Sequence, residues 1–187
     1  MAKIALGIVL FLTMMMQAAL ADTYKVDPVH SSVVGRIKHL KISNVTGRFN
    51  GATGTVEYDP AAPEKATFDV QVASKDVDTA NSKRDTHLRS DDFFDVEKYP
   101  TIGFKSKTVK SAGENTLEIT GDLTLHGVTK PITITLKLTG TGADPKGGQR
   151  SGFATEFTID RTDYGMKTSM GVANEVKLMI DLEAAKE

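Results

Sequence analysis

Regular alternation of apolar and polar residues is the feature that most restricts how this chain can fold. It recurs in five segments, with apolar side chains at nearly every second position of residues 68–72, 117–125, 132–138, 153–159 and 176–182. Successive side chains of a β-strand point to opposite faces, so each segment predicts a strand with one dry face and one wet face. This pattern is typical of antiparallel sheets, because strands of parallel sheets are usually apolar on both faces.

Shorter extended segments at residues 24–26, 31–38 and 54–58 bring the expected number of strands to about eight. Stretches rich in turn-forming residues separate the strands, at residues 59–63, 126–131 and 140–148. The chain contains no linker and no internal repeat, so we expect one all-β domain that is either a sandwich or a closed barrel. A barrel of about eight strands can fill with its own side chains or hold one slender ligand.

The stretch from Asp85 to Phe104 interrupts the alternation with clustered charge, a His, three Phe, a Tyr and a Pro. Ser90 is followed by two aspartates, which predicts that a helix begins there. Pro100 predicts a return to extended chain. We expect this stretch to be a short helical plug or lid between two halves of the β-structure.

Residues 1–21 have the features of a cleavable signal peptide. Lys3 supplies a positive start, residues 4–16 form an apolar run, and Ala19-Leu20-Ala21 has the small-x-small form of a cleavage site. The mature domain would then comprise residues 22–187 and lie in a bacterial periplasm. It would have 22 basic and 24 acidic residues, which gives no reason to expect nucleic acid as a partner. The chain has no Cys, so burial alone must hold the fold together.

No catalytic or cofactor motif is present, whether a nucleophile elbow, a zinc-protease helix, a phosphate loop or a dinucleotide glycine pattern. The four His are scattered, and a metal site would need several ligands to converge, so we expect no metal. Lys83, Arg84 and Arg89 form the densest basic cluster after the signal. It is either a solvated face balanced by nearby aspartates or a site for an anionic head group.

Six motifs occur in order along the mature chain: Asp27-Pro-Val-His30-Ser31, Val45-Thr-Gly47-Arg-Phe49, Asp85-x-His87-Leu88-Arg89-Ser90-x-Asp92-Phe93-Phe94-Asp95-Val96, Tyr99-Pro100-x-Ile102-x-Phe104, Gly121-Asp-Leu-Thr-Leu-His-Gly127-Val-Thr-Lys130 and Asp160-Arg161-x-Asp163-Tyr164-Gly165. Together they resemble the YceI-like family, described as periplasmic polyisoprenoid-binding proteins. The one departure is Tyr164, where the family commonly has Phe.

The resemblance implies a lipocalin-like, extended antiparallel β-barrel whose apolar interior holds the tail of a polyisoprenoid lipid or an isoprenoid quinone. It implies a binding protein and not an enzyme. Members are also associated with fatty amides and with stress-related expression. The implied partner is a hydrophobic lipid, and transient membrane contact and a homodimer are left open. The candidate ligand-binding residues are His87, Arg89 and Asp92, which we assign to the head group, with Phe93, Phe94, Phe104, Ile119, Gly121, Leu123 and Phe157 for the tail.

Two other interpretations remain. The protein could be an enzyme acting on a hydrophobic substrate, with His87 and either Asp85 or Asp92 as acid and base. It could also be an interaction domain with a solid barrel, which an interior cavity would argue against. Gly121 lies on a dry face within a strand, where a glycine often leaves room for something inside. We therefore expect its replacement by Leu, or Ile119→Trp, to reduce lipid uptake more than stability.

Overall fold

The structure is a computed structural model that describes residues 21–187; the predicted signal peptide lies almost entirely outside the described residues. The described part contains eleven strands, the helix α1 (Ser82–Arg89) and the short 3-10 helices η1 (Pro63–Lys65), η2 (Ser74–Asp76) and η3 (Arg161–Tyr164). The strands are β1 (Asp22–Val26), β2 (Ser32–His39), β3 (Ser43–Phe49), β4 (Thr53–Tyr58), β5 (Thr67–Ala73), β6 (Val77–Asp78), β7 (Thr101–Gly113), β8 (Thr116–Leu125), β9 (Val128–Ala143), β10 (Gln149–Asp160) and β11 (Val172–Lys186).

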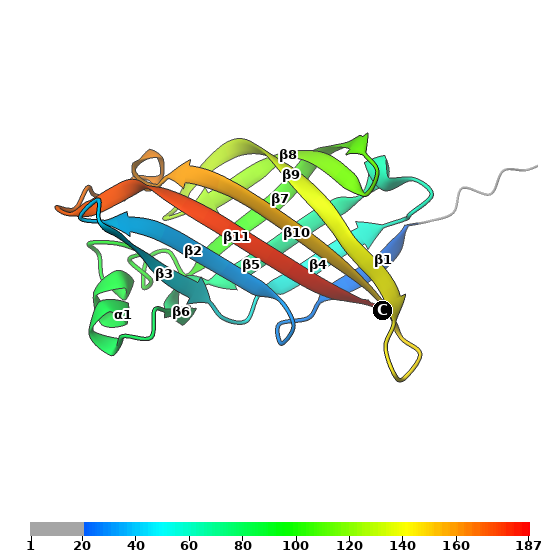
Figure 1. Cartoon of the computed structure of the whole chain (residues 1–187), viewed down its shortest axis with the longest axis horizontal. Helices are drawn as coiled ribbons and strands as arrows, with labels where there is room; N and C mark the ends of the chain where they lie inside the picture. Colours follow the sequence, from blue (N-terminus) through cyan, green and yellow to red (C-terminus); the bar gives the residue numbers. More distant parts are fainter. Residues whose placement is uncertain (1–20) are drawn as a thin grey trace, which may run out of the picture.

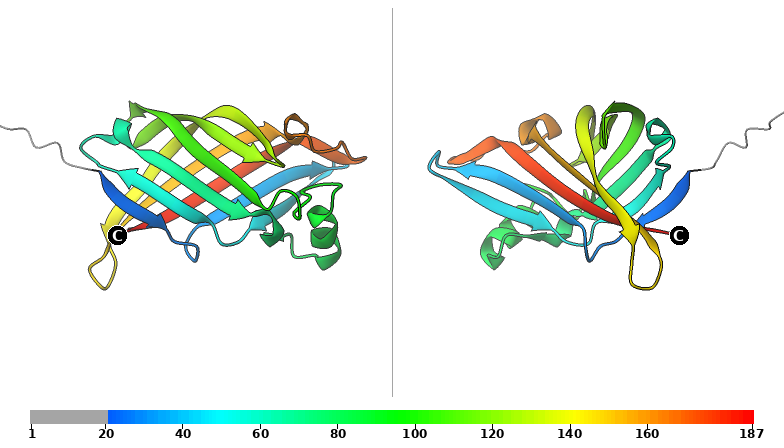
Figure 2. Two further views of the ribbon diagram at one scale, coloured as in Figure 1. Left: turned by 180° about the vertical axis from the view of Figure 1, so that it is seen from behind. Right: turned by 45° about the vertical axis from the view of Figure 1, so that its right-hand side comes forward.

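Eight of these strands close into an antiparallel barrel (Figures 1 and 2). Their order is β1-β4-β5-β7-β8-β9-β10-β11, and β11 pairs back with β1. The length of β11 makes this possible, because residues 184–186 pair with β1 while residues 172–181 pair with β2. The predicted all-β barrel of about eight strands with one short helix is therefore confirmed, and the sandwich is excluded.

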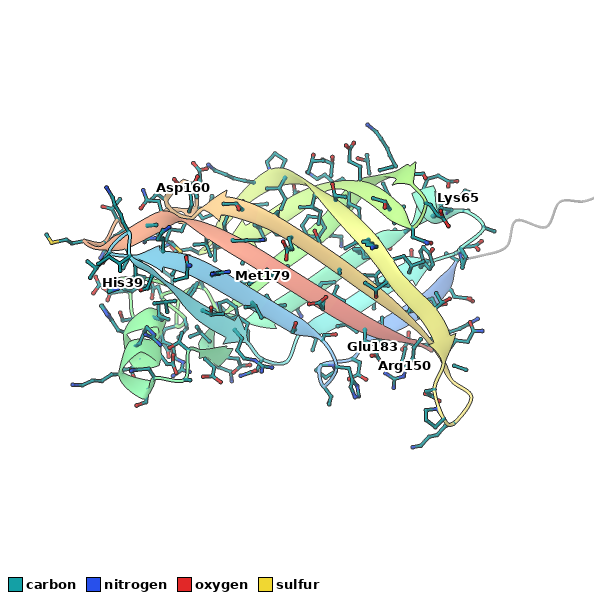
Figure 3. The ribbon with its side chains drawn as sticks, viewed as in Figure 1. His39, Lys65, Arg150, Asp160, Met179 and Glu183 are labelled. Carbon is teal, nitrogen blue, oxygen red and sulfur yellow. The ribbon has the colours of Figure 1, made fainter. Side chains whose placement is uncertain are left out.

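Strands β2, β3 and β6 extend the wall of the barrel at one end of the molecule. β2 pairs with β11 and with β3, and β3 pairs with β6. Helix α1 lies at this end, which we call the α1 end (Figure 1). The opposite end, where β1 meets the end of β11, is the β1 end. Figure 3 labels His39 and Asp160 at the α1 end and Arg150 and Glu183 towards the β1 end.

Three of the observed strands were not expected from the sequence, although the number of strands in the closed barrel agrees with the expected number of about eight. β3 and the two-residue β6 lie in the extension, and β7 belongs to the barrel. β7 has three lysines, at positions 105, 107 and 110, so its apolar alternation is weak, and none of its residues is buried. The predicted strand at 31–38 is β2, which lies outside the closed eight.

The helix of the insert begins earlier than predicted. Asn81 is its N-cap and accepts a hydrogen bond from the Arg84 backbone N–H, whereas Ser90 is the C-cap. The hydroxyl of Ser90 donates to the His87 carbonyl at 2.7 Å, so this side chain satisfies a carbonyl at the end of the helix instead of an N–H at its start. Residues 91–99 form turns, and the chain becomes extended after Pro100, as predicted.

The turn expected at residues 126–131 is shorter than predicted. His126 and Gly127 alone connect β8 to β9, both with positive φ, as a two-residue hairpin of this kind requires. Gly127 is also needed sterically, because a Cβ there would lie 2.4 Å from the Tyr99 ring. Pro131 is part of β9, opposite Asp122 of β8, at a position beyond the β10 pairing, where its missing N–H costs no ladder hydrogen bond.

The β1 end of the barrel is filled by side chains. Phe153 of β10 is 1% exposed and packs edge-to-face on Tyr58 and Phe68, with ring centroids 5.6 Å and 5.4 Å apart. Tyr24 and Val56 are buried in the same cluster. Such close packing leaves no room for a ligand there, so any interior space must lie towards the α1 end.

Candidate functional site

A cavity of about 500 Å³ occupies the barrel interior and extends to the α1 end. This volume lies within the range of small-molecule sites, roughly 300–1,000 Å³. Its wall consists mainly of aliphatic and aromatic side chains, which come from the inward-facing positions of alternating strands, as the sequence pattern predicts. The solid interaction domain considered above is therefore excluded as a description of this barrel.

Two glycines form part of the wall where β2 pairs with β3. Gly35 and Gly47 face each other across this pair and both line the cavity. A Cβ at Gly35 would meet its nearest neighbour, Val176, at 3.6 Å, which is ordinary contact. Any larger side chain at position 35 would therefore extend towards the cavity, and the absence of a side chain there contributes to its volume.

The polar residues that line the cavity include no carboxylate. They are Gln71, Thr79, Thr155 and Ser169, together with the basic or titratable His39, Arg84, His87 and Arg161. Thr155 is already satisfied, because its hydroxyl donates to the Thr135 carbonyl at 2.7 Å. The basic groups come from β2, α1 and η3, which meet at the α1 end. This end of the cavity therefore favours negative charge and hydrogen-bond acceptors over cations.

Arg161 is the most buried of these basic groups, at 3% exposed. Its Nε donates to the Ala173 carbonyl at 3.1 Å and its Nη1 donates to the Lys167 carbonyl, whereas Nη2 has no partner among the described residues. Its guanidinium lies 5.9 Å from the Phe93 ring centroid. Burial lowers the pKa of Arg161 from its ordinary value. The sequence analysis noted Arg161 only within a motif and did not count it as a site residue; no sequence signal separates it from an arginine on the surface.

Hydrogen bonds to the β6 region fix α1 at the cavity. The Asp85 carboxylate accepts the Thr79 N–H at 2.9 Å and the Thr79 hydroxyl at 2.5 Å, and these bonds lower the pKa of Asp85. Arg89 donates to the Lys75 and Val77 carbonyls at 2.6 Å and 2.7 Å. The turn that follows α1 contributes Phe94, whose ring packs on Phe49 of β3. The insert is therefore part of the cavity wall.

Seven of the ten predicted site residues line the cavity: His87, Phe93, Phe94, Phe104, Ile119, Leu123 and Phe157. Arg89 and Asp92 do not. Arg89 is engaged by backbone carbonyls, as described above, and Asp92 is exposed, where it pairs with Lys167 at 3.2 Å and His87 at 3.4 Å. Of the basic cluster, Arg84 lines the cavity, but it also donates to the hydroxyl and the carbonyl of Thr79. Lys83 is exposed and not part of the wall.

Gly121 is the third predicted residue outside the wall, and its expected role needs correction. A Cβ at this position would lie 2.5 Å from the Lys105 carbonyl oxygen and 2.6 Å from the Phe104 ring. The Phe104 side chain, not the cavity, occupies the space in front of Gly121. Gly121→Leu would therefore force the two strands or the Phe104 ring to move, and it would reduce stability before it blocked a ligand.

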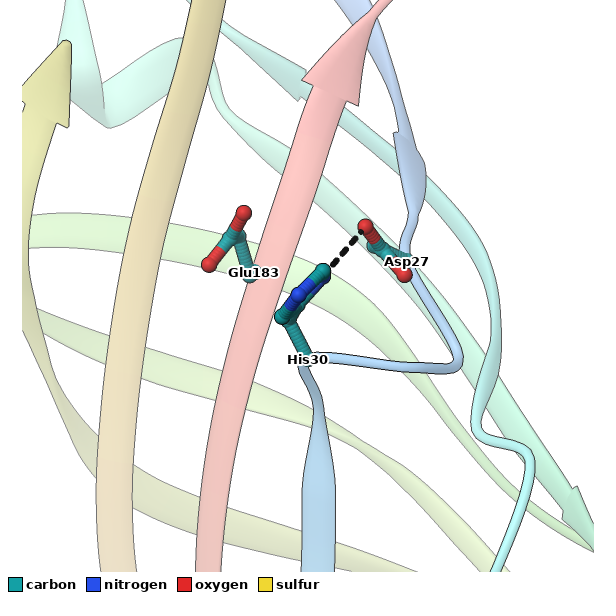
Figure 4. Close-up of side chains that lie close together, drawn as sticks. All are labelled: Asp27, His30 and Glu183. Carbon is teal, nitrogen blue, oxygen red and sulfur yellow. Dashed lines mark hydrogen bonds and ion pairs between the residues drawn. The ribbon is translucent and has the colours of Figure 1, made fainter. Parts of the chain in front are cut away.

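Asp27, His30 and Glu183 converge at the β1 end, with one ligand atom from each residue within 4.8 Å of the others (Figure 4). Arg150 already occupies the two carboxylates, with Nη1 2.7 Å from Asp27 and 2.6 Å from Glu183. A metal ion would have to displace this guanidinium, so the group is better described as an ionic latch between the end of β1 and strands β10 and β11.

The latch predicts an acid-dependent loss of stability. Hydrogen bonds from His30, Arg150 and the Val29 N–H hold the pKa of Asp27 far below its ordinary value. A depressed pKa contributes stability that is complete above the unfolded pKa of about 4 and is lost as the pH falls further. We expect Asp27→Asn to lower the free energy of unfolding by on the order of 2 kcal/mol at neutral pH. The free energy of unfolding of this variant should also fall less steeply than that of wild type as the pH drops below about 4. Urea unfolding at several pH values measures this, with Asp69→Asn in an exposed pair as the control; equal acid dependence in Asp27→Asn and wild type would contradict it.

No helix between residues 21 and 187 is long and apolar enough to cross a bilayer. The family model of the YceI-like domain matches residues 24–184. The chain belongs to the YceI-like family. The resemblance inferred from the sequence motifs is thereby confirmed.

Known proteins match most or all of the chain. Protein YceI of Escherichia coli O157:H7 is 43% identical over 192 residues, and the match covers all of both chains. The crystal structure of the Campylobacter jejuni YceI protein is 33% identical, with a TM-score of 0.73, over 80% of this chain and 90% of that one. A polyisoprenoid-binding domain from Saccharophagus degradans is 16% identical, with a TM-score of 0.69, over 90% of this chain and 100% of that domain, and this shows a shared fold.

Proposed function

We propose that the protein is a periplasmic lipid carrier that holds an isoprenoid tail in the barrel cavity. The observation that carries this proposal is an apolar cavity of about 500 Å³ inside a closed barrel. Membership of the YceI-like family supports it, and so does the shared fold with a domain described as polyisoprenoid-binding. Family and cavity both favour binding over catalysis, and the cavity contains no carboxylate to act as an acid or base.

The physical requirement for a carrier is modest. Burial of each CH₂ of a lipid tail contributes about 0.8 kcal/mol relative to water. A tail in a bilayer is already shielded from water, so its transfer to the cavity gains little of this free energy. The cavity therefore needs to match the bilayer only approximately, and loading and unloading both remain feasible. An aliphatic wall with few polar groups satisfies this requirement, because it does not select strongly along the tail.

The ligand is oriented with its tail towards the β1 end and its head group at the α1 end. The β1 end is closed by packed aromatic side chains, whereas His39, Arg84, His87 and Arg161 line the α1 end. A head group with acceptor oxygens, as in a phosphate or a quinone, suits these groups. Of the three residues that the sequence analysis assigned to the head group, only His87 keeps this role. Arg89 and Asp92 do not line the cavity, and Arg161 is added as a head-group residue.

Export to the periplasm rests on the signal predicted for residues 1–21. Fractionation of the producing bacterium, followed by mass determination of the mature protein, tests this part. We expect a periplasmic protein that starts at Asp22. A cytoplasmic protein that keeps its N-terminus would refute export without affecting the binding proposal.

Lipid extraction from protein purified without detergent, followed by mass spectrometry, tests the ligand. We expect an isoprenoid lipid or isoprenoid quinone at close to one per barrel. A fatty amide as the main ligand would keep the carrier role but refute the isoprenoid assignment. Protein that stays empty in cells with ample isoprenoid, and that takes up none from vesicles, would refute both.

A further inference from the structure

Three large apolar side chains are exposed together at the α1 end. Leu40, Ile42 and Met170 are 56%, 84% and 100% exposed. Leu40 and Ile42 belong to the turn between β2 and β3, and Met170 belongs to the turn that precedes β11. The Leu40 N–H donates to the Gly171 carbonyl at 2.6 Å, so the two turns are joined. We call these two turns, residues 40–42 and 169–171, the apolar tip. Exposure of three such side chains to water is unfavourable, which indicates that another surface covers the tip when the protein functions.

The two turns of the apolar tip are flanked along the chain by basic residues. Residues 28–56 contain four Lys or Arg and no Asp or Glu, and residues 164–174 contain one Lys and no acid. The full chain, by contrast, has 23 basic and 24 acidic residues. Lys38 lies two residues before the tip and Lys41 belongs to it, and both are exposed, while Lys167 pairs with Asp92. A partner surface for the tip must therefore be apolar at its centre and negative around it.

The tip also borders the cavity. His39 is the last residue of β2 and directly precedes the tip. Ser169 belongs to the second turn, and Val172 follows it. All three residues line the cavity. Figure 3 labels His39 at the extreme α1 end of the barrel. Whatever the tip contacts therefore lies beside the end of the cavity that we assign to the head group.

We propose that the apolar tip inserts into the surface of a bilayer that contains anionic lipids. Three side chains on two narrow turns are far too few for a stable protein interface, which has about 20–30 residues on each side. Apolar side chains with flanking lysines are instead the pattern of interfacial membrane binding, where the apolar groups reach the acyl boundary and the lysines meet anionic head groups. The role of this contact, lipid exchange through the α1 end, rests on the proposed function; the contact itself depends only on the tip.

Co-sedimentation with phosphatidylcholine vesicles, with and without phosphatidylglycerol, tests the proposal. We expect wild-type protein to bind the anionic vesicles more tightly than the neutral ones. Ile42→Asp should lower the partition coefficient at least about tenfold, because a carboxylate replaces an inserted side chain. Val29→Asp is the matched control: Val29 is 79% exposed, but it lies beyond the opposite end of β2. Equal binding of the two variants would overturn the proposal, as would wild-type protein that binds neither kind of vesicle.

A second pair of variants tests the charge. Lys38→Gln with Lys41→Gln should reduce binding to anionic vesicles about fivefold per lysine and leave binding to neutral vesicles unchanged. Lys65 is exposed and lies far from the α1 end (Figure 3), and Lys146 is exposed in the turn between β9 and β10. Changing both to Gln should alter neither kind of binding. Equal losses in both double variants would show a diffuse charge effect and overturn the tip as the site. Protein that carries lipid but binds no vesicle would refute docking alone, whereas vesicle binding by protein that never carries lipid would refute the carrier role alone.

Discussion

Gly35→Leu is expected to lower the lipid content of the purified protein about tenfold or more without reducing its stability. Gly35 lines the cavity, has no positive φ, and has ordinary contact distances around the position of a Cβ. A leucine there would place three further carbons in space that a ligand tail needs. In delipidated protein the free energy of unfolding should stay constant or rise by about 0.5–1 kcal/mol, because glycine is unfavourable within a strand.

The matched control is Gly140→Leu. Gly140 belongs to β9, is exposed, and has no atom within 4 Å of the position of its Cβ. The same chemical change there adds no atom to the cavity, so the lipid content should equal that of wild type. Quantitative lipid mass spectrometry, normalised to folded protein, measures both variants. An unchanged lipid load in well-folded Gly35→Leu would mean that the ligand does not occupy the cavity between β2, β3 and β11.

The choice of Gly35 shows what the sequence could and could not predict. Alternation predicted which side chains face inward, but it left a sandwich and a barrel open, and the resemblance to the YceI-like family decided for the barrel. Alternation could not distinguish Gly121 from Gly35, because both are glycines at inward positions of strands. The difference comes from the neighbours: the Phe104 ring covers Gly121, whereas Gly35 lies opposite Gly47 and a Cβ there would meet Val176 at an ordinary 3.6 Å. Packing between neighbouring strands fixes the side-chain rotamers, and a local sequence pattern contains no information about this packing.

The polar part of the site was harder to predict for a similar reason. Arg89 and Asp92 are in the motif with His87, but Arg89 ends α1 and donates to backbone carbonyls, and Asp92 lies in the following turn and pairs with Lys167. Arg161 is far from them in sequence and reaches the cavity through the turn after β10. The helix start was misplaced because Ser90 with Asp91 and Asp92 matches an N-cap pattern, although Asn81 begins the helix and Ser90 ends it.

Phe153→Ala and Phe157→Ala should differ widely in their effect on stability. Both residues belong to β10 and point inward, four positions apart. Phe153 is 1% exposed and packed between two aromatic rings, so its loss creates a cavity in a solid core and should cost about 3–5 kcal/mol. Phe157 is only partly buried and already borders the cavity, so its loss should cost at least about 2 kcal/mol less.

The comparison needs delipidated protein, because a ligand that binds only the folded state adds to its stability. Urea unfolding of the empty variants should reveal the full difference between them. In lipid-loaded protein the difference should narrow, since Phe157→Ala then also loses contacts with the tail, whereas Phe153→Ala loses none. Equal costs in empty protein would mean that the barrel is equally packed at both ends. A cavity that is closed at the β1 end and extends to the α1 end would then be wrong, and with it the orientation of tail and head group that places exchange beside the apolar tip.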